Sequence, residues 1–421
     1  MTVPIAASQV ARTVLPNGLT CLVRPFRETG VATIHGYVKA GGIFDGARPG
    51  LARFAGSTLI RGTRRRSARH LAEDLDAMGA SLAVSPGTET TVITGRALAE
   101  DLPRLLAMAA EILVEPAFPA DEVEKVRGEL LTALRVNSLD TRQVAERIFR
   151  RLTYPEGHPH SRHPDGEEAV LEALQPDDLR AFHAHHFQPG ATVIAVVGDV
   201  DPGYATDQLA RAFGEWVRGP WRMPAFPPPA GSVVRRQEEA VVPGKTQSDL
   251  VLGGPGVART DPDYYGVMMA NLLLGQLGMM GRIGRAVREQ QGMAYYAYSE
   301  LRAGLLAGPW WVRAGVNPVN VERAIAQILR EVADLQAHGP APDELADART
   351  FLVGSLAVRL ESSAGIAQTL ADIELYDLGL DHLERYPSII AGVSRDDVVA
   401  AVRRFPTDGA VLAIAGPQRQ P

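Results

Sequence analysis

The chain has 421 residues, of which 46% are hydrophobic and 22% are charged, and its formal net charge is −6. This length is enough for two or three domains with sizeable cores, and the composition is that of a globular protein. The acidic balance excludes the basic footprint of a nucleic-acid-binding protein. Cys21 is the only cysteine, which excludes an intrachain disulfide and a cysteine-based zinc site.

The sequence gives no sign of a membrane segment. No apolar run reaches the length that spans a bilayer, so we expect no membrane partner. Residues 1–12 lack the basic and apolar blocks of a signal peptide. As it stands, the sequence predicts a cytoplasmic protein, whereas removal of a leader would place it in the periplasm. The compartment therefore stays open.

Residues 50–63 read GLARFAGSTLIRGT and have the frame of a zinc-peptidase helix without its chemistry. In the inverted zinc motif H-x-x-E-H, two histidines one turn apart bind one metal and the glutamate activates a water. Arg53, Gly56 and Ser57 stand at those three positions here. Arginine has no lone pair to offer, glycine has no base, and a serine hydroxyl is a poor zinc ligand. We therefore predict that this chain holds no metal and needs no cofactor.

The frame resembles G-L-A-H-F-L-E-H-M-x-F-x-G-T, the form of the motif in the pitrilysin/insulinase family, which includes the mitochondrial processing peptidases. The resemblance implies a third zinc ligand, a glutamate on a helix about 76 residues after the second histidine, which leads to Ala133. Residues 129–135 resemble the family's V-V-L-E-E-I-R, with Thr132 and Ala133 in place of the two acids. The nearest acid is Glu129. The whole ligand set is replaced in register, which indicates a dismantled site.

Two groups of histidines and a basic run invite other interpretations. The first histidine group lies in GHPHSR at 157–162, which resembles a surface segment of the family, and its prolines indicate a loop. No acid or cysteine completes a ligand set in the second group, so we predict no metal at either. The basic run at 61–66 is predicted to be a solvated turn. The histidines are His158, His160 and His163, then His183, His185 and His186.

An internal repeat organises the chain. The segment that starts at Asp121 matches the one that starts at Asp343, 222 positions later, and both show helical apolar spacing with acids in the first turn. A second helix starts near Asp177 and leads to a buried β-branched strand. Its counterpart starts near Asp396, 219 positions later, and also leads to such a strand.

A proline-rich stretch separates the two halves and reads as a stiff, extended linker. We predict domains at 1–217 and 233–421 with the linker at 218–232. The fold class expected is α+β: two homologous domains, each an antiparallel-rich sheet with helices packed on one face. The resemblance implies the same fold, with two such chains closing around a chamber.

The second half carries the family's other signature. Residues 281–295 read GRIGRAVREQQGMAY and resemble S-R-L-F-x-x-v-R-e-x-x-G-L-a-Y, with Arg288 and Tyr295 seven positions apart. The resemblance implies that this pair reaches a zinc site in a partner chain, the tyrosine donating to the oxyanion and the arginine holding a substrate carbonyl. The alternative is that Arg288 caps a helix or pairs with Glu289, and that Tyr295 is a strand aromatic. Strand alternation predicts Tyr296 on the opposite face.

The glycine-rich stretch 274–281 lacks the G-K-[ST] ending of a phosphate loop. The resemblance implies a loop that guides substrate, which makes Gly278 and Gly281 candidate substrate-binding positions. A mobile connecting loop is the alternative.

These observations predict a non-catalytic subunit of a heterodimeric zinc peptidase that processes or degrades peptides. Its partner would be a homologous chain with an intact H-x-x-E-H motif, and the zinc would belong to that partner. The alternatives are a scaffold, or a peptide-binding homodimer with no hydrolytic role, and a homodimer is also possible for the isolated chain. Retention of Arg288 and Tyr295 argues against the scaffold.

Overall fold

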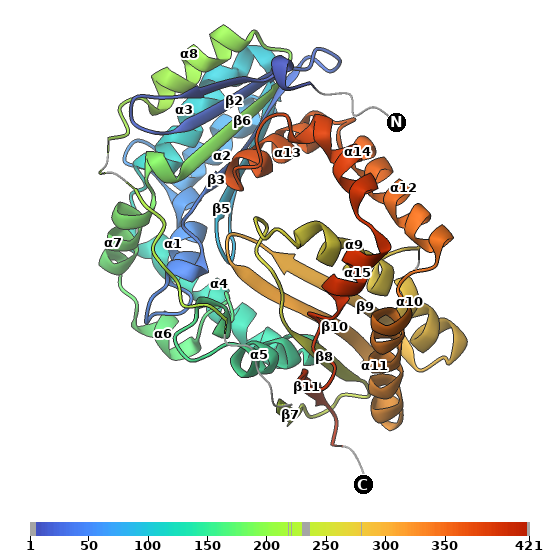
Figure 1. Ribbon diagram of the computed structural model, residues 1–421. Coiled ribbons are helices and arrows are strands. Elements are labelled where there is room, and N and C mark those ends of the chain that lie inside the picture. The colour runs from blue at the N-terminus through green and yellow to red at the C-terminus, as the bar shows by residue number, and fades with distance from the viewer. Residues whose placement is uncertain (1–5, 218, 220, 230–235, 279, 419–421) are drawn as a thin grey trace.

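The computed structural model describes residues 6–217, 219, 221–229, 236–278 and 280–418. The first half, coloured blue to green in Figure 1, contains one sheet and its helices. Its elements are β1 (Ala11–Val14), β2 (Thr20–Pro25), β3 (Val31–Val38), α1 (Leu51–Thr58), α2 (Ala68–Ala77), β4 (Ser81–Pro86), β5 (Thr91–Leu98), α3 (Leu102–Val114), α4 (Ala120–Ser138), α5 (Thr141–Thr153), α6 (Glu168–Ala173), α7 (Pro176–His186), β6 (Thr192–Gly198) and α8 (Pro202–Phe213).

The second half, coloured yellow to red, repeats the order of elements from β2 to β6, without counterparts of β1 and α8 among the described residues. It contains β7 (Arg236–Val241), β8 (Ser248–Pro255), α9 (Tyr264–Gly275), α10 (Gly281–Gly284), which runs into a π-helix (Arg285–Gln290), β9 (Ala294–Ala303), β10 (Ala307–Val316), α11 (Val321–His338), α12 (Pro342–Arg359), α13 (Ser363–Leu375), α14 (His382–Gly392), α15 (Arg395–Val402) and β11 (Val411–Gly416).

The five strands of the second sheet repeat the topology of β2 to β6 in the first sheet, and β1 is an additional edge strand without a counterpart among the described residues. The strand orders of the two sheets are β1-β2-β6-β3-β5-β4 and β7-β11-β8-β10-β9. In each sheet one pair is parallel, β2 with β6 and β7 with β11, and the other pairs are antiparallel. The helices α4 and α12, and the strands β6 and β11, occupy equivalent places in the two halves. The predicted α+β fold with two homologous, antiparallel-rich sheets is therefore confirmed.

The linker predicted at 218–232 is only partly described. Residues 218, 220 and 230–232 lie outside the described residues, and the segment 221–229 forms no helix or strand. Trp221 and Phe226 of this segment pack against the first core, and the Lys39 ammonium lies 5.2 Å from the centre of the Trp221 ring. The domain boundaries stay a prediction.

Each half packs its own helices on one face of its sheet. In the first half, Ile34 and Val196 of the sheet share a core with Leu105 of α3 and Phe54 of α1. In the second half, strands β8, β10 and β11 share an equivalent core with α9, α11 and α15. Burial of these apolar side chains is the main favourable term for each half.

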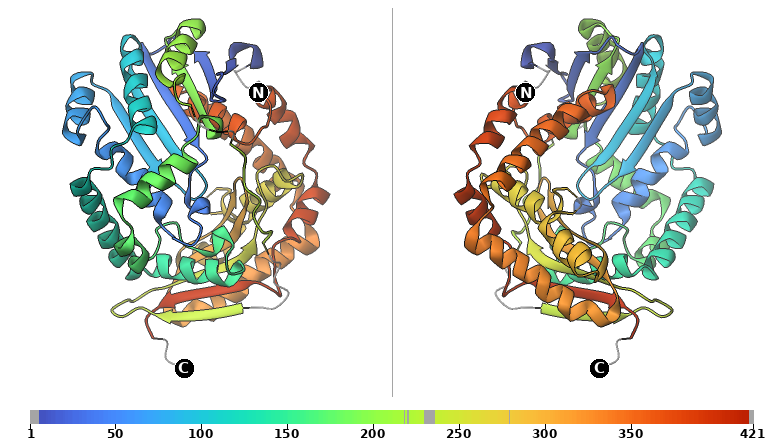
Figure 2. Two further views of the ribbon diagram at one scale, coloured as in Figure 1. Left: turned by 90° about the vertical axis from the view of Figure 1, so that its left-hand side faces the viewer. Right: turned by 90° about the vertical axis from the view of Figure 1, so that its right-hand side faces the viewer.

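The opposite face of each sheet is covered by a helix from the other half (Figures 1 and 2). Helix α5 packs on the second sheet, where the Phe149 and Trp311 rings are 5.4 Å apart. Helix α13 packs on the first sheet, where Ile366 and Leu370 share a cluster with apolar residues of β2 and β6. The sequence did not indicate this exchange, since apolar periodicity does not reveal which sheet a helix covers.

Polar contacts fix the start of both exchanged helices. Thr141, the first residue of α5, donates from its hydroxyl to the buried carboxylate of Asp249 in β8. Ser363, the first residue of α13, shares a hydroxyl–hydroxyl bond of 2.9 Å with Thr33 of β3. Because buried polar groups are costly unless paired, these bonds favour one seating of each helix on its sheet.

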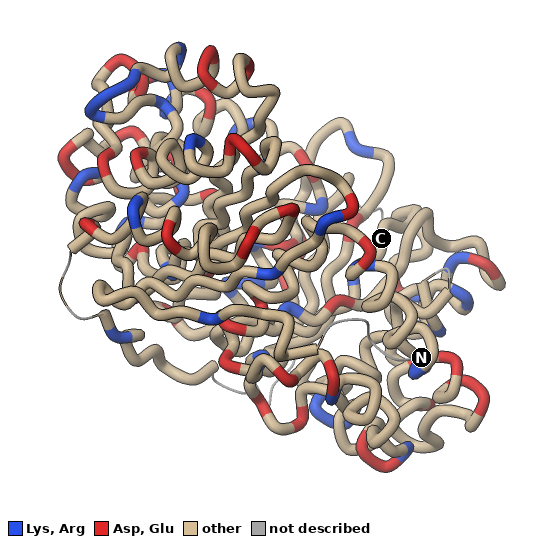
Figure 3. The backbone as a smooth tube through the Cα atoms, turned by 90° about the horizontal axis from the view of Figure 1, so that it is seen from above, with Lys and Arg blue, Asp and Glu red and all other residues tan. Residues whose placement is uncertain are grey.

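Charges of both signs are interspersed over the two halves in the view of Figure 3. None of the described helices has the length and the apolar character that crossing a membrane requires.

The exchange predicts that the halves unfold together. Phe149→Ala removes an aromatic side chain that is fully buried between α5 and the second sheet, so it should lower the free energy of unfolding by about 3–5 kcal/mol. Urea unfolding followed by tryptophan fluorescence and by far-UV circular dichroism should give one coincident transition for both proteins.

Arg151→Ala is the matched control on the same helix. Its guanidinium is exposed and pairs with Glu238 on the surface, so the loss should stay within about 1 kcal/mol. Two separate transitions, of which Phe149→Ala shifts only one, would contradict the interlocked arrangement.

Candidate functional site

Helix α1 carries the degenerate motif and is fixed at its start by Asp45. The carboxylate of Asp45 accepts the backbone N–H groups of Gly50 and Ala52, both at 2.7 Å. Burial raises the pKa of Asp45 to about 6, although these two hydrogen bonds oppose the shift. Leu51 and Phe54 of α1 are buried in the first core, whereas Arg53 and Ser57, one turn apart, are half-buried.

Arg53 is committed to an ion pair. Its Nη1 donates to Oδ1 of Asp165, and the other carboxylate oxygen accepts from Nδ2 of Asn137 at 2.9 Å. Arg53 lies on α1 and Asn137 lies on α4, one turn beyond Ala133. Asp165 therefore bridges the two helices on which the resemblance implies a zinc site.

The position of the catalytic glutamate has no room for a side chain. A Cβ added at Gly56 would lie 2.7 Å from Cβ and 3.1 Å from Cγ of Pro86, the last residue of β4. Such distances are below van der Waals contact, so a carboxylate at this position requires Pro86 to move.

The third ligand position is also unsuited to a metal. Ala133 on α4 offers no lone pair, and Glu129, one turn before it, accepts from Arg61 at 2.7 and 2.9 Å. Within the described residues, no group of three or more His, Cys, Asp or Glu side chains could hold a metal ion. The residues at these positions do not fit the zinc ion that the resemblance associates with this motif.

A second buried carboxylate connects this region to the other half. The carboxylate of Glu146 in α5 accepts a hydrogen bond from Nε of Arg150 at 2.9 Å. It also forms an ion pair with Nη2 of Arg313 in β10 at 3.0 Å. Burial opposes the ionisation of Glu146, but the two arginines outweigh it and lower its pKa. His163 lies between the two carboxylates, with Nε2 3.9 Å from Glu146 and Nδ1 3.5 Å from Asp165. The sequence did not reveal this network, because its members are far apart in the chain.

Two other members of the histidine groups contact an aromatic ring and a backbone carbonyl. His158 stacks on Tyr154 with ring centres 4.7 Å apart, and His183 Nε2 lies 2.8 Å from the carbonyl oxygen of Leu113. Desolvation lowers the pKa of four histidines to about 4 and also lowers that of His163. These four are His35, His158, His186 and His382.

Arg288 and Tyr295 lie in the second half. Tyr295 is on β9, the edge strand, and its side chain is 74% exposed. Arg288 is half-buried in the π-helix that precedes β9, a form of helix that is frequent at functional sites. Neither side chain forms a hydrogen bond or an ion pair with another described residue. Tyr296 lies on the opposite face, where it donates to Asp249, and the Arg142 guanidinium lies 4.9 Å from its ring centre.

The structure does not bring this pair to the degenerate motif of the same chain. Helix α1 packs against α4, α7 and β4, whereas β9 and its π-helix pack against α9, α10, α11 and β10.

The two candidate glycines differ. Gly278 has a φ of 65° and nothing within 4 Å of an added Cβ, which leaves it open toward a ligand. Gly281 also has a φ of 65°, but an added Cβ would lie 2.6 Å from the backbone of Leu274 and Gly275. Glycine at 281 is thus required by the fold, whether or not the loop contacts a substrate.

Comparison with known families agrees with this architecture. A family model described as insulinase, peptidase family M16, matches residues 27–157, and one described as peptidase M16 inactive domain matches residues 173–352. The chain belongs to the M16 peptidase family. The recognition made from the two sequence signatures is therefore confirmed.

Relatives of this M16 chain extend over almost all of its length. An uncharacterized zinc protease of Streptomyces coelicolor is 28% identical over 97% of this chain and 90% of its own length. An uncharacterized zinc protease of Mycobacterium tuberculosis is 27% identical over 98% of this chain and 94% of its own length. The crystal structure of a peptidase M16 inactive domain from Pseudomonas fluorescens superposes with a TM-score of 0.91, at 26% identity, over 98% of this chain and 100% of its own. A protease from Helicobacter pylori shares the fold, with a TM-score of 0.87 at 19% identity over 97% of this chain and 99% of its own.

The contact between Gly56 and Pro86 can be tested by a double-mutant cycle. Gly56→Ala should lower the free energy of unfolding by about 1–3 kcal/mol through overpacking, although alanine favours helices. In a Pro86→Gly background, which removes both the Cβ at 2.7 Å and the Cγ at 3.1 Å, most of that loss should disappear. Chemical denaturation of the four proteins measures the coupling.

Gly128→Ala on α4 is the control, because nothing lies within 4 Å of an added Cβ there. It should stabilise the chain by about 0.5–1 kcal/mol. If Gly56→Ala behaves in the same way, the position has room and the steric argument is wrong.

The buried histidines predict acid sensitivity. Each should be neutral when folded and protonated when unfolded between about pH 4 and the ordinary pKa of about 6.5. Their contribution to stability is thus complete above pH 6.5 and is lost as the pH falls toward 4. Burial also raises the pKa of two carboxyl groups, that of Asp45 to about 6 and that of Asp372, and these two groups change stability in the opposite direction over part of this range.

His35→Phe should reduce the slope of unfolding free energy against pH by about 1.4 kcal/mol per pH unit between pH 6 and 4.5. Urea titrations at several pH values measure that slope, and the exposed His70→Phe is the control. An unchanged slope in His35→Phe would show that this histidine is protonated in the folded chain.

Proposed function

We propose that this chain is the non-catalytic subunit of a heterodimeric M16 zinc peptidase. A homologous partner with an intact H-x-x-E-H motif would supply the zinc and the general base. This chain would supply one wall of the chamber, together with Arg288 and Tyr295. Peptides, rather than folded proteins, would be the substrates, since an enclosed chamber excludes large bodies.

The observation that carries the proposal is the state of the zinc-motif positions. Arg53 is held by Asp165, Gly56 faces Pro86, and Ala133 has no ligand atom. Such a chain has no means of generating a metal-bound hydroxide by itself. A complete active site then requires another polypeptide.

A second observation favours a role beyond scaffolding. Tyr295 and Arg288 are donors without a partner among the described residues, and Tyr295 is 74% exposed on an edge strand. An exposed tyrosine hydroxyl and a free guanidinium can donate to charge that develops on a substrate. The neighbouring Tyr296 is instead used within the fold.

The proposal predicts that the purified chain carries no stoichiometric zinc and cleaves no peptide. Addition of a zinc-bearing M16 chain from the same host should restore hydrolysis that depends on Tyr295. Tyr295→Phe should lower kcat about 10²–10³-fold with little change in KM, since such a donor acts mainly in the transition state. Arg288→Ala should show much of its effect in KM. Metal analysis, size-exclusion chromatography and peptide-cleavage kinetics provide the measurements.

Tyr298→Phe is the matched control on the same strand, because the Tyr298 hydroxyl forms no hydrogen bond with a described residue. Tyr296→Phe would leave the buried Asp249 with one donor fewer, so it is expected to affect stability first. If the Tyr295→Phe complex assembles normally and keeps full activity, the proposed in-trans role of Tyr295 is wrong, and the scaffold function takes its place. One zinc per isolated chain would overturn the proposal as a whole.

A further inference from the structure

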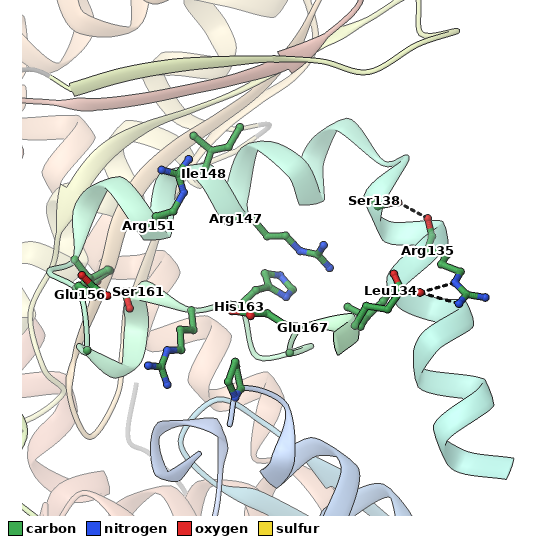
Figure 4. A pocket seen from close by; sticks show the side chains of 16 residues that line it. Leu134, Arg135, Ser138, Arg147, Ile148, Arg151, Glu156, Ser161, His163 and Glu167 are labelled. Atoms are coloured by element: carbon green, nitrogen blue, oxygen red, sulfur yellow. Dashed lines mark hydrogen bonds and ion pairs between the residues drawn. The ribbon is translucent and has the colours of Figure 1, made fainter. Parts of the chain in front are cut away.

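Each half contains a cavity, and the two cavities differ in the charged groups that a ligand can reach. The larger cavity, of about 780 Å³, lies between α4, α5 and the chain before α6, and Figure 4 shows its lining. The Nε and Nη2 atoms of Arg147 have no hydrogen-bond partner among the described residues, but they are closed to solvent. Arg135 and Arg151 are paired with Glu168 and Glu238. The guanidinium edge of Arg147 is thus out of reach of a ligand.

The second cavity, of about 330 Å³, lies where the start of α9, the end of α12, α13 and the start of α14 meet (Figure 1). Its volume is at the lower end of the range of small-ligand sites. The wall is largely apolar and aromatic. Leu352 and Ile373 lie in it beside four tyrosines, which are Tyr264, Tyr265, Tyr376 and Tyr386.

Arg259 places an accessible guanidinium in this wall. Its Cζ lies 4.0 Å from the centre of the Tyr264 ring and 5.3 Å from the centre of the Tyr265 ring, and Nη2 donates to the Tyr265 hydroxyl at 3.3 Å. Nε and Nη1 have no partner among the described residues, but unlike the two Arg147 atoms they are not closed to solvent. The tyrosine rings therefore fix the guanidinium and leave part of its edge free to donate.

Arg359, the last residue of α12, is a second cation that lines the cavity. It is exposed, and its side chain forms no hydrogen bond or ion pair with a described residue. Its charge acts on the same groups as that of Arg259. Burial raises the pKa of Tyr264 and that of Tyr386, and both arginines oppose these shifts. The two guanidinium groups therefore face a common space.

Asp372 on α13 supplies the opposite charge, and it is the only acid among the described residues that line the cavity. Its Oδ1 accepts the Tyr37 hydroxyl at 2.7 Å, whereas Oδ2 has no partner among the described residues and is not closed to solvent. Burial raises the pKa of Asp372, and the hydrogen bond from Tyr37 and the charges of Arg359 and Arg259 oppose this shift. Neither arginine forms an ion pair with Asp372, so a gap separates the two cations from the anion.

This arrangement matches a ligand that carries both charges close together. A carboxylate without an amine would leave Oδ2 of Asp372 unpaired and would be repelled by it. An amine without a carboxylate would be repelled by the two guanidinium groups. The apolar and aromatic wall leaves room for a hydrophobic side chain. A free α-amino acid has all of these features, and it is small enough for the cavity.

We propose that this cavity binds a free α-amino acid with a large apolar side chain. The α-carboxylate lies between Arg259 and Arg359, the α-ammonium group donates to Oδ2 of Asp372, and the side chain packs on the tyrosine rings. Neither Arg288 nor Tyr295 lines the cavity. The site is thus separate from the residues that the chain would contribute to a peptidase, and it requires no zinc-bearing partner.

The test is calorimetric titration of the isolated chain with L-phenylalanine, N-acetyl-L-phenylalanine and L-phenylalaninamide. The free amino acid should bind. Each derivative should bind about tenfold more weakly or worse, because each lacks one charge-assisted contact. The derivatives also represent the two ends of a peptide, since the acetyl compound resembles a C-terminus and the amide resembles an N-terminus.

Two variants separate the contributions of the two charges. Asp372→Asn, which keeps an acceptor for Tyr37, should weaken binding of L-phenylalanine about tenfold but should not weaken binding of the acetyl compound, which has no ammonium group. Arg359→Met should weaken binding of L-phenylalanine but not that of the amide, which has no carboxylate. Asp377→Asn and Arg323→Met are the matched controls, because both residues are exposed and lie outside the cavity. Both should bind as the unaltered chain does.

The proposal is wrong if L-phenylalanine does not bind, or if either derivative binds as tightly. Equal binding of the acetyl compound would make this a site for peptide C-termini, and equal binding of the amide would make it a site for N-termini. Unchanged binding by either variant would also overturn the proposal. If Asp372→Asn fails to fold, Arg359→Met, at an exposed position, still decides. Because no partner and no hydrolysis are involved, the result does not depend on the Tyr295 experiment.

Discussion

The exchange of α5 and α13 between the two sheets is the constraint on which the rest of the structure depends. Each sheet has an apolar face that its own half leaves uncovered, and the other half supplies the helix that buries it. The hydroxyl contacts at Thr141 and Ser363 favour one seating of each helix. Since α5 carries Glu146 and Arg147, the same exchange fixes the carboxylate network and the cavity beside it.

The degenerate motif illustrates how a metal-site frame can persist after its ligands are gone. In a zinc-binding relative, the resemblance implies that the ion connects α1 to α4. In this chain Asp165 makes that connection, with Arg53 on one oxygen and Asn137 on the other. A carboxylate bridge retains the approach of the two helices without any hydrolytic chemistry, and Pro86 occupies the space that a glutamate at position 56 requires. The fold of the first half is thus compatible with the loss of the metal.

The sequence predicted the fold class, the repeat and the family, because helical spacing, buried strands and two long signatures are local patterns. It also placed Tyr296 opposite Tyr295, since strand alternation is local. It could not show that Asp165 meets Arg53, because that contact joins positions 112 apart through the path of a loop. The position of Pro86 beneath Gly56 depends on packing between separate elements, which no local pattern encodes. The resemblance implies that Gly281 is a substrate-binding position, but its backbone angle and crowded surroundings already explain the glycine.

The exchanged helices α5 and α13 also restrict how far the two halves of this chain can separate. To swing the halves apart as a hinge, α5 and α13 would have to leave their sheets and expose both apolar faces to water, which costs far more than ordinary domain closure. Proteolytic cleavage in the segment 221–229 would leave the two fragments associated, because α5 and α13 would still be packed on the sheets of the opposite halves. The two halves of this chain are therefore held together as one unit by the exchanged helices, not by the segment that joins them.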